Sequence, residues 1–190
     1  MTIAGIVLAA GASRRLGQAK QLVAFQGEQL VRTAVRAARG ARVAQVAVVL
    51  GARSKDVMPA VLGTGAEIVH NAKWETGVAS SIAAGVQWAQ RGKHAAVLLC
   101  VCDQPLISAA HLDALIREHE STGDVIASRY GAVVGVPAVF PEARFAALTA
   151  LTGDQGARAL LREGVVREVP WDAGAVDVDT PDDLAALRAM

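Results

Sequence analysis

A loop rich in glycine and basic residues follows the first apolar segment of the chain. Residues 8–27 read LAAGASRRLGQAKQLVAFQG, directly after the apolar run Ile3–Leu8, which is typical of a buried parallel strand. Gly11 and Gly17 lack a Cβ, so an anion can come close to the backbone N–H groups around them. Two arginines and Lys20 add positive charge. This composition predicts a nucleotide-phosphate site, with a solvated basic loop as the alternative.

The spacing within this loop excludes two common phosphate-binding motifs. A Walker A loop has four residues between its glycines and places Lys and Ser/Thr directly after the second one. Here five residues separate Gly11 from Gly17, and Lys20 is followed by Gln21. The G-x-G-x-x-G fingerprint of dinucleotide-binding proteins is absent from the sequence.

Asp103 stands at the exit of the most apolar strand pattern in the chain, and Pro105 restricts the backbone just beyond it. Such a carboxylate suits Mg²⁺, which binds one or two protein carboxylates and completes its shell with water and substrate phosphates. Asp177 and Asp179, which precede the last expected helix, are candidates for a second carboxylate. Asp103 could instead cap a helix, although Ser108 is the better cap, and Asp179 could support the N-terminus of the last helix.

The segments around these residues alternate between strand and helix patterns. Short apolar runs indicate strands, and apolar residues at helical spacing indicate helices packed on a sheet. This alternation predicts an α/β fold with a mostly parallel sheet covered by helices on both faces, in a single domain over residues 1–190. The expected strands are Ile3–Leu8, Val46–Leu50, Glu67–Val69, Ala95–Val101 and Val125–Ala127; the expected helices are Gln29–Arg39, Val78–Gln90, Ala109–Glu118 and one that begins at Pro181 with Thr180 as its N-cap.

The carboxyl ends of these strands are the expected place for a ligand. In open α/β sheets, ligands bind in the crevice outside that edge. Four polar segments should therefore meet there. They are Gly11–Lys20, His70–Ser81, Asp103–Pro105 and Asp177–Thr180.

Composition and charge exclude several classes of protein. The 190 residues include 19 Lys and Arg against 18 Asp and Glu, a net charge of +1, which does not suit a protein that binds nucleic acid or a membrane surface. No apolar stretch is long enough to span a bilayer and the N-terminus does not resemble a signal peptide, so we expect a cytoplasmic protein. Cys100 and Cys102 have no further cysteines to complete a zinc site and are expected to be small buried residues.

Several motifs together resemble one family. LAAGASRRLGQAKQL resembles the signature LAAG-x-S-x-R-M-G-x-x-K-x-L of the MobA-like NTP transferases, and the similarity continues in the family's order through NAKWETGVASSIAAGV, CDQP, GVPAVF, GDQGAR and DVDTPDDL. Within the family the chain is most similar to the molybdenum cofactor cytidylyltransferases, because the guanylyl-transferring relatives usually carry LAGG. Leu16 stands in place of Met and Ala72 in place of Pro. Val136 replaces a polar residue between Gly135 and Pro137, which the resemblance assigns to the wall on the acceptor side.

The resemblance implies a Rossmann-like, GT-A-like nucleotidyltransferase fold. It also implies Mg²⁺-dependent transfer of CMP from CTP to the phosphate of molybdenum cofactor, with release of pyrophosphate and with a molybdoenzyme as a candidate recipient. A phosphate nucleophile is already anionic at neutral pH, so positioning and charge stabilisation suffice and no general base is required. Two alternatives stay open: the same transfer with GTP or to a sugar phosphate or another small phosphorylated metabolite, and a non-catalytic carrier or maturation factor for molybdenum cofactor.

The resemblance also assigns roles residue by residue. Lys20, Arg15 and Asp103 are the expected catalytic residues, with Lys20 on the nucleotide phosphates. Asp103, assisted by Asp179, is expected to hold the metal. The expected nucleotide-binding residues are Leu8, Ala9, Ala10, Gly11, Lys20, Asn71, Gly77, Ser80, Ser81 and Asp103.

Overall fold

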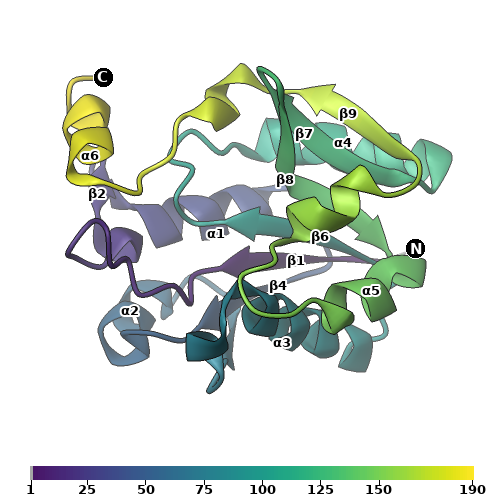
Figure 1. The fold of residues 1–190 in the computed structure, drawn as a ribbon, viewed down its shortest axis with the longest axis horizontal. Helices are drawn as coiled ribbons and strands as arrows, with labels where there is room; N and C mark the ends of the chain where they lie inside the picture. The colour runs from purple at the N-terminus through teal and green to yellow at the C-terminus, as the bar shows by residue number, and fades with distance from the viewer. Residues whose placement is uncertain (1) are drawn as a thin grey trace.

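The computed structural model of the chain describes residues 2–190 and is built on one seven-stranded sheet (Figure 1). The strands lie in the order β5-β4-β1-β6-β8-β7-β9, so β1 and β6 are neighbours in the middle of the sheet. β8 runs antiparallel to both its neighbours, and the other pairs are parallel. The strands are β1 (Ile3–Leu8), β4 (Gln45–Leu50), β5 (Glu67–His70), β6 (Ala96–Val101), β7 (Val125–Tyr130), β8 (Val133–Pro141) and β9 (Val166–Pro170), and β2 (Ala24–Phe25) and β3 (Glu28–Gln29) form a separate hairpin.

Helices cover both faces of the sheet. One face carries α1, α2 and α4, and the other carries α3 and α5. The helices are α1 (Leu30–Gly40), α2 (Ser54–Val61), α3 (Val78–Arg91), α4 (Ala109–Thr122), α5 (Phe145–Ala150) and α6 (Pro181–Arg188), with 3-10 helices η1 (Lys20–Leu22), η2 (Trp74–Thr76), η3 (Glu142–Arg144), η4 (Ala157–Arg162) and η5 (Asp172–Ala175).

Two packing features position the segments at the carboxyl edge of the sheet. In α3, Gly85 lies directly against β1, since a Cβ there would come within 2.6 Å of Ile6 Cγ2. This close approach fixes the N-terminus of α3 beside the end of β1. At the other side of that edge, α6 lies next to the β2–β3 hairpin (Figure 1), where Leu184 and Leu187 pack with Leu16. The last helix is therefore attached to the loop that follows β1.

The sequence predicted most of these elements. All five expected strands and all four expected helices are present, and the mostly parallel sheet with helices on both faces is confirmed. Ser108 caps α4 by accepting a hydrogen bond from the His111 N–H, and Thr180 caps α6 in a capping box with Asp183. Cys100 and Cys102 are buried, as expected. α2, α5, β8 and β9 were not predicted; α2 contains Pro59, a residue that usually ends or bends a helix.

No helix within residues 2–190 has the length and apolar character that crossing a membrane would need.

His111 gives the fold a defined sensitivity to acid. Its ring is buried and stacks on Trp171, with 4.6 Å between the ring centroids. Its Nε2 lies 2.8 Å from Ser128 Oγ, and that hydroxyl donates to the Pro137 carbonyl, so the His111 ring must donate in its neutral form. Burial lowers the pKa of His111 to about 4. Protonation therefore favours the unfolded chain, in which a histidine has a pKa of about 6.5.

We expect the free energy of unfolding to fall as the pH decreases from about 6.5 towards 4, because the unfolded chain binds more protons in this window. The His111→Gln variant should show a shallower decline, and the exposed His70→Gln change serves as the control. Urea unfolding across this pH range measures the effect. An unchanged slope in His111→Gln would show that another group causes the acid sensitivity.

Candidate active site

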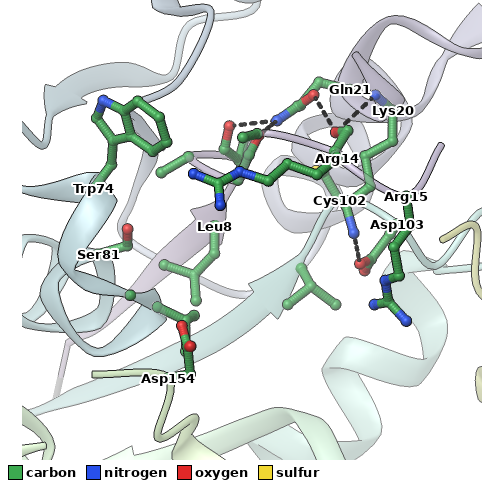
Figure 2. A pocket seen from close by; sticks show the side chains of 18 of the residues that line it. Leu8, Arg14, Arg15, Lys20, Gln21, Trp74, Ser81, Cys102, Asp103 and Asp154 are labelled. Carbon is green, nitrogen blue, oxygen red and sulfur yellow. Dashed lines mark hydrogen bonds and ion pairs between the residues drawn. The ribbon is translucent and has the colours of Figure 1, made fainter. Parts of the chain in front are cut away.

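A cavity of about 480 Å³ opens at the carboxyl ends of β1 and β6. The pairing of Leu8 with Val101 places these two strand ends side by side, so the residues that follow each strand share one cavity. Figure 2 shows the side chains around it. Its wall is formed by Leu8, Ala9, Ala10, Gly11, Ala12, Ser13, Arg14, Arg15, Lys20, Gln21, Trp74, Glu75, Gly77, Val78, Ser81, Val101, Cys102, Asp103 and Asp154.

The loop after β1 is held in shape by Gln21. This side chain is fully buried, and its Nε2 donates to the carbonyls of Ala9 at 2.9 Å and Gly11 at 2.8 Å. Ser13 Oγ accepts from the Lys20 backbone N–H at 3.1 Å and donates to Gln21 Oε1 at 3.4 Å. The loop is therefore preorganised around an internal polar bridge. This role of Gln21 was not predicted; the only sign of it in the sequence is an amide side chain directly after Lys20.

Four charged side chains meet at one end of the cavity. Lys20 Nζ lies 2.5 Å from Asp103 Oδ2 and 2.9 Å from Asp179 Oδ1, and Arg15 contacts the other oxygen of Asp179 at 2.6 Å. The Lys20 and Asp103 side chains are 16% and 19% exposed, whereas Arg15 is 72% exposed. Burial alone lowers the pKa of Lys20, but the charges and hydrogen bonds of Asp103 and Asp179 outweigh it and raise the pKa above its ordinary value. Lys20 is a permanent ammonium in this position.

The segment before Asp179 is hydrogen-bonded to the residues that follow β6. Val178 is fully buried and its N–H donates to the Asp103 carbonyl at 3.0 Å. Residues 177–179 do not form a strand, but Asp179 turns towards Lys20 and Asp177 is exposed. Loss of part of its hydration and the negative charges of Asp103 and Asp179 raise the pKa of Asp177. Of the two candidate partners for Asp103, Asp179 is the one that the fold brings to Lys20.

The opposite wall comes from η2 and the start of α3. Gly77 has φ +106°, and a Cβ there would overlap the Gly153 carbonyl, which also accepts from the Ala79 N–H at 3.1 Å. This contact brings the following residue, Asp154, to the cavity. Asp154 was not predicted as a site residue because its position depends on a long-range backbone contact.

Asn71 and Ser80 lie behind this wall and not on it. Asn71 Nδ2 donates to Ser80 Oγ at 2.8 Å and to Ser81 Oγ at 3.0 Å, and Asn71 Oδ1 accepts from the Lys73 N–H at 2.9 Å. Of these serines, Ser81 lines the cavity. The structure therefore gives Asn71 and Ser80 a supporting position, while Gly77 and Ser81 face the space where a ligand would lie.

Gly135 and Pro137 lie on β8, away from the wall of this cavity. Gly135 packs under Tyr130, because a Cβ there would come within 2.5 Å of the tyrosine hydroxyl oxygen. The neighbouring Val136 carbonyl accepts from Gln104 Nε2 at 3.2 Å, which links β8 to the residue after Asp103. The acceptor-side role of Gly135 and Pro137 stays a prediction.

Sequence comparison places most of the chain in a known family. Residues 5–169 match the MobA-like NTP transferase domain. The chain belongs to this nucleotidyltransferase family. The matched span contains Lys20, Asp103 and Asp154, whereas Asp179 lies beyond it and enters the site through the contacts described above.

Several other proteins resemble the chain over nearly its whole length. It is 30% identical to nicotine blue oxidoreductase of Paenarthrobacter nicotinovorans, over 99% of this chain and 94% of that protein. It is 29% identical to the purine catabolism protein PucB of Bacillus subtilis (strain 168), over 97% and 95%. Among solved structures, Rv0371c of Mycobacterium tuberculosis H37Rv has a TM-score of 0.84 and 32% identity over 100% and 98% of the two chains, and its complex with manganese has a TM-score of 0.78 and 30% identity over 98% of each.

A more distant structure supports the fold. A nucleotidyl transferase from Methanothermobacter thermautotroptrophicus superposes with a TM-score of 0.85 at 23% identity, over 99% of this chain and 96% of that one. The Rossmann-like nucleotidyltransferase fold expected from the sequence is thereby confirmed.

The charged cluster fits the divalent metal that the family implies. Asp103 and Asp179 both contact the same ammonium, so a cation of higher charge at that position would have a carboxylate oxygen on each side. Within residues 2–190 no group of three or more His, Cys, Asp or Glu side chains could hold a metal. Mg²⁺ needs only one or two protein carboxylates when water and phosphate oxygens complete its shell. Asp103 and Asp179 would supply that number of carboxylates.

Substitution of Gly11 in the MobA-like domain tests whether a ligand binds at the loop after β1. Its Cβ position meets no protein atom within 4 Å, although Gly11 lines the cavity. Gly11→Ala should therefore change the free energy of unfolding by less than about 0.5 kcal/mol. A methyl group there should nevertheless obstruct an anion and weaken nucleotide binding about tenfold, or about 1.4 kcal/mol.

The control for Gly11→Ala is Gly156→Ala, because a Cβ at Gly156 also meets no atom and Gly156 does not line the cavity. Titration calorimetry with nucleoside triphosphates and thermal unfolding measure the two effects. Equal nucleotide affinity in the Gly11 and Gly156 variants would show that no ligand approaches the backbone at Gly11.

Proposed function

We propose that this protein transfers CMP from CTP to the phosphate of molybdenum cofactor in a Mg²⁺-dependent reaction that releases pyrophosphate. The observation that carries the proposal is the cluster of Lys20, Asp103 and Asp179 beside the loop braced by Gln21, in a cavity of about 480 Å³. A cation, two carboxylates and a loop with open space at Gly11 are suited to phosphoryl chemistry. We further propose a single domain over residues 1–190 that works in the cytoplasm.

The acidic and basic residues of the site have different roles in this reaction. When bound at Asp103 and Asp179, Mg²⁺ would neutralise phosphate charge. Lys20 and Arg15 would stabilise negative charge on the phosphates as it develops. An oxygen of the acceptor phosphate attacks the α-phosphorus in line; the new P–O bond forms as the bond to the β-phosphate oxygen breaks, and pyrophosphate leaves with that electron pair. No side chain has to remove a proton, because the attacking phosphate is already ionised.

Two observations support the choice of metal and nucleotide. The manganese complex of Rv0371c is a divalent-cation complex of a protein 30% identical to this chain. Ala10 places a methyl group in the first motif, at the cavity wall, where guanylyl-transferring relatives usually carry glycine. That methyl group and Ser81 are the first candidates for base selection, since base selection works through shape and unpaired hydrogen-bonding groups.

The test is pyrophosphate release with Mg²⁺, with CTP, GTP, ATP and UTP each paired with molybdenum cofactor and with a panel of sugar phosphates and other small phosphorylated metabolites. Release confined to CTP with molybdenum cofactor is the expected result. Release with another pair would overturn the proposed substrates but support the proposed type of reaction. Nucleotide binding without release from any pair would favour the non-catalytic carrier or maturation factor.

A further inference from the structure

The cavity is chemically polarised along its length. One end holds Lys20, Arg15 and Asp103, the charged groups that suit phosphates and a metal. The rest of the wall includes Trp74, the smaller residues Ala10 and Val78, and the carboxylates of Glu75 and Asp154. This inference rests on the proposed nucleotide site: if phosphates lie at the charged end, the base of the same nucleotide lies towards Trp74.

Trp74 is held firmly as part of the wall. A Cβ added at Gly51 would come within 2.5 Å of Trp74 Cβ and 2.9 Å of Ala10 Cβ, so the three residues are in close packing. The Trp74 carbonyl also accepts from the Gly77 N–H at 3.2 Å. Trp74 is only partly buried, whereas Trp88 and Trp171 are each 9% exposed. Trp74 therefore offers an anchored aromatic surface to the cavity.

Arg14 faces this surface from the loop after β1. Figure 2 shows its side chain extending across the cavity towards the wall that carries Trp74, whereas Arg15 turns to the side of Asp103. Arg14 is exposed, and across residues 2–190 it takes part in no side-chain hydrogen bond or ion pair. Its guanidinium is thus available to a ligand, in contrast to Lys20, which two carboxylates already hold.

We propose that Trp74 and Arg14 clamp the base of the bound nucleotide, with the indole stacked on one face of the ring and the guanidinium on the other. Every nucleobase has a π-face that can stack on an aromatic side chain, and a planar guanidinium stacks on such rings as well. The clamp therefore contributes the same affinity for the nucleotide whether it carries one, two or three phosphates. The choice between bases is left to the smaller residues at the ring edge.

The experiment compares the binding of CMP, CDP and CTP to the whole protein without turnover, by calorimetry and by intrinsic tryptophan fluorescence. Trp74→Ala should weaken all three nucleotides by the same factor, about ten- to a hundredfold, and Trp74→Phe should largely restore binding. Arg14→Ala should also weaken all three equally. Fluorescence should change on CMP binding in the wild type and in Trp88→Phe but not in Trp74→Phe.

The controls separate this inference from the proposed function. Arg117→Ala removes an exposed positive charge on α4, away from the cavity, and should leave binding unchanged. A wild-type protein that binds none of the nucleotides would overturn the proposed function. Wild-type binding with unchanged affinity in Trp74→Ala would overturn the clamp alone. Losses that grow from CMP to CTP in Arg14→Ala would also overturn it, because they would assign Arg14 to the phosphates.

Discussion

Replacing Asp103 with asparagine is expected to lower the rate of pyrophosphate release by about a thousandfold or more. Asn has nearly the same shape, so the change removes the negative charge and leaves the packing at the end of β6 intact. The charge matters twice: Asp103 is the more buried of the two carboxylates that would hold the metal, and its Oδ2 positions Lys20 Nζ at 2.5 Å. Both contributions act on charge that develops during transfer of the nucleotidyl group.

Single-turnover release of pyrophosphate at saturating nucleotide, with thermal unfolding of each variant, measures this effect. The melting temperature of Asp103→Asn should stay close to that of the wild type because the side chain lies at the mouth of the cavity and not in the core. Asp172→Asn, a change at an exposed aspartate of η5, is the control. A wild-type rate in Asp103→Asn would remove Asp103 from the mechanism.

The sequence predicted the site residues that lie next to a clear strand or helix signal. Asp103 follows an apolar strand whose direction is fixed by the parallel sheet, so its place at the carboxyl edge follows from the pattern alone. The loop with Lys20 follows β1 in the same way. Asp179 was expected at that edge because it precedes a clear helix-start signal, and the contact with Lys20 confirms that the segments meet.

The residues and strands that were missed depend on burial or on contacts that local sequence patterns do not show. Gln21 matters because it is buried and bonds to two loop carbonyls, and burial of a polar side chain is not visible in a motif. Asp154 reaches the cavity through the approach of Gly153 to Gly77. β8 was missed for a similar reason, since its antiparallel pairing with β6 and β7 is set by the order of strands in space and not by local composition.

Replacing Lys20 with methionine is expected to lower turnover strongly and, at the same time, to strengthen binding of a divalent cation to the nucleotide-free protein. The ammonium lies between Asp103 and Asp179, where a metal would have to bind. The raised pKa of Lys20 means that a metal must displace a charged group, because the lysine does not lose its proton at neutral pH. Methionine keeps the length of the side chain and leaves two like charges close together, which a divalent cation would neutralise.

The two effects of Lys20→Met therefore have opposite signs, and each has its own measurement. Turnover should fall by about a hundredfold or more through the loss of a phosphate-binding cation. Affinity for Mn²⁺, titrated by electron paramagnetic resonance without nucleotide, should rise about tenfold. Lys55→Met, at an exposed lysine of α2, should change neither. Mn²⁺ affinity that stays constant or falls in Lys20→Met would show that Asp103 and Asp179 do not hold the metal, even if turnover is lost.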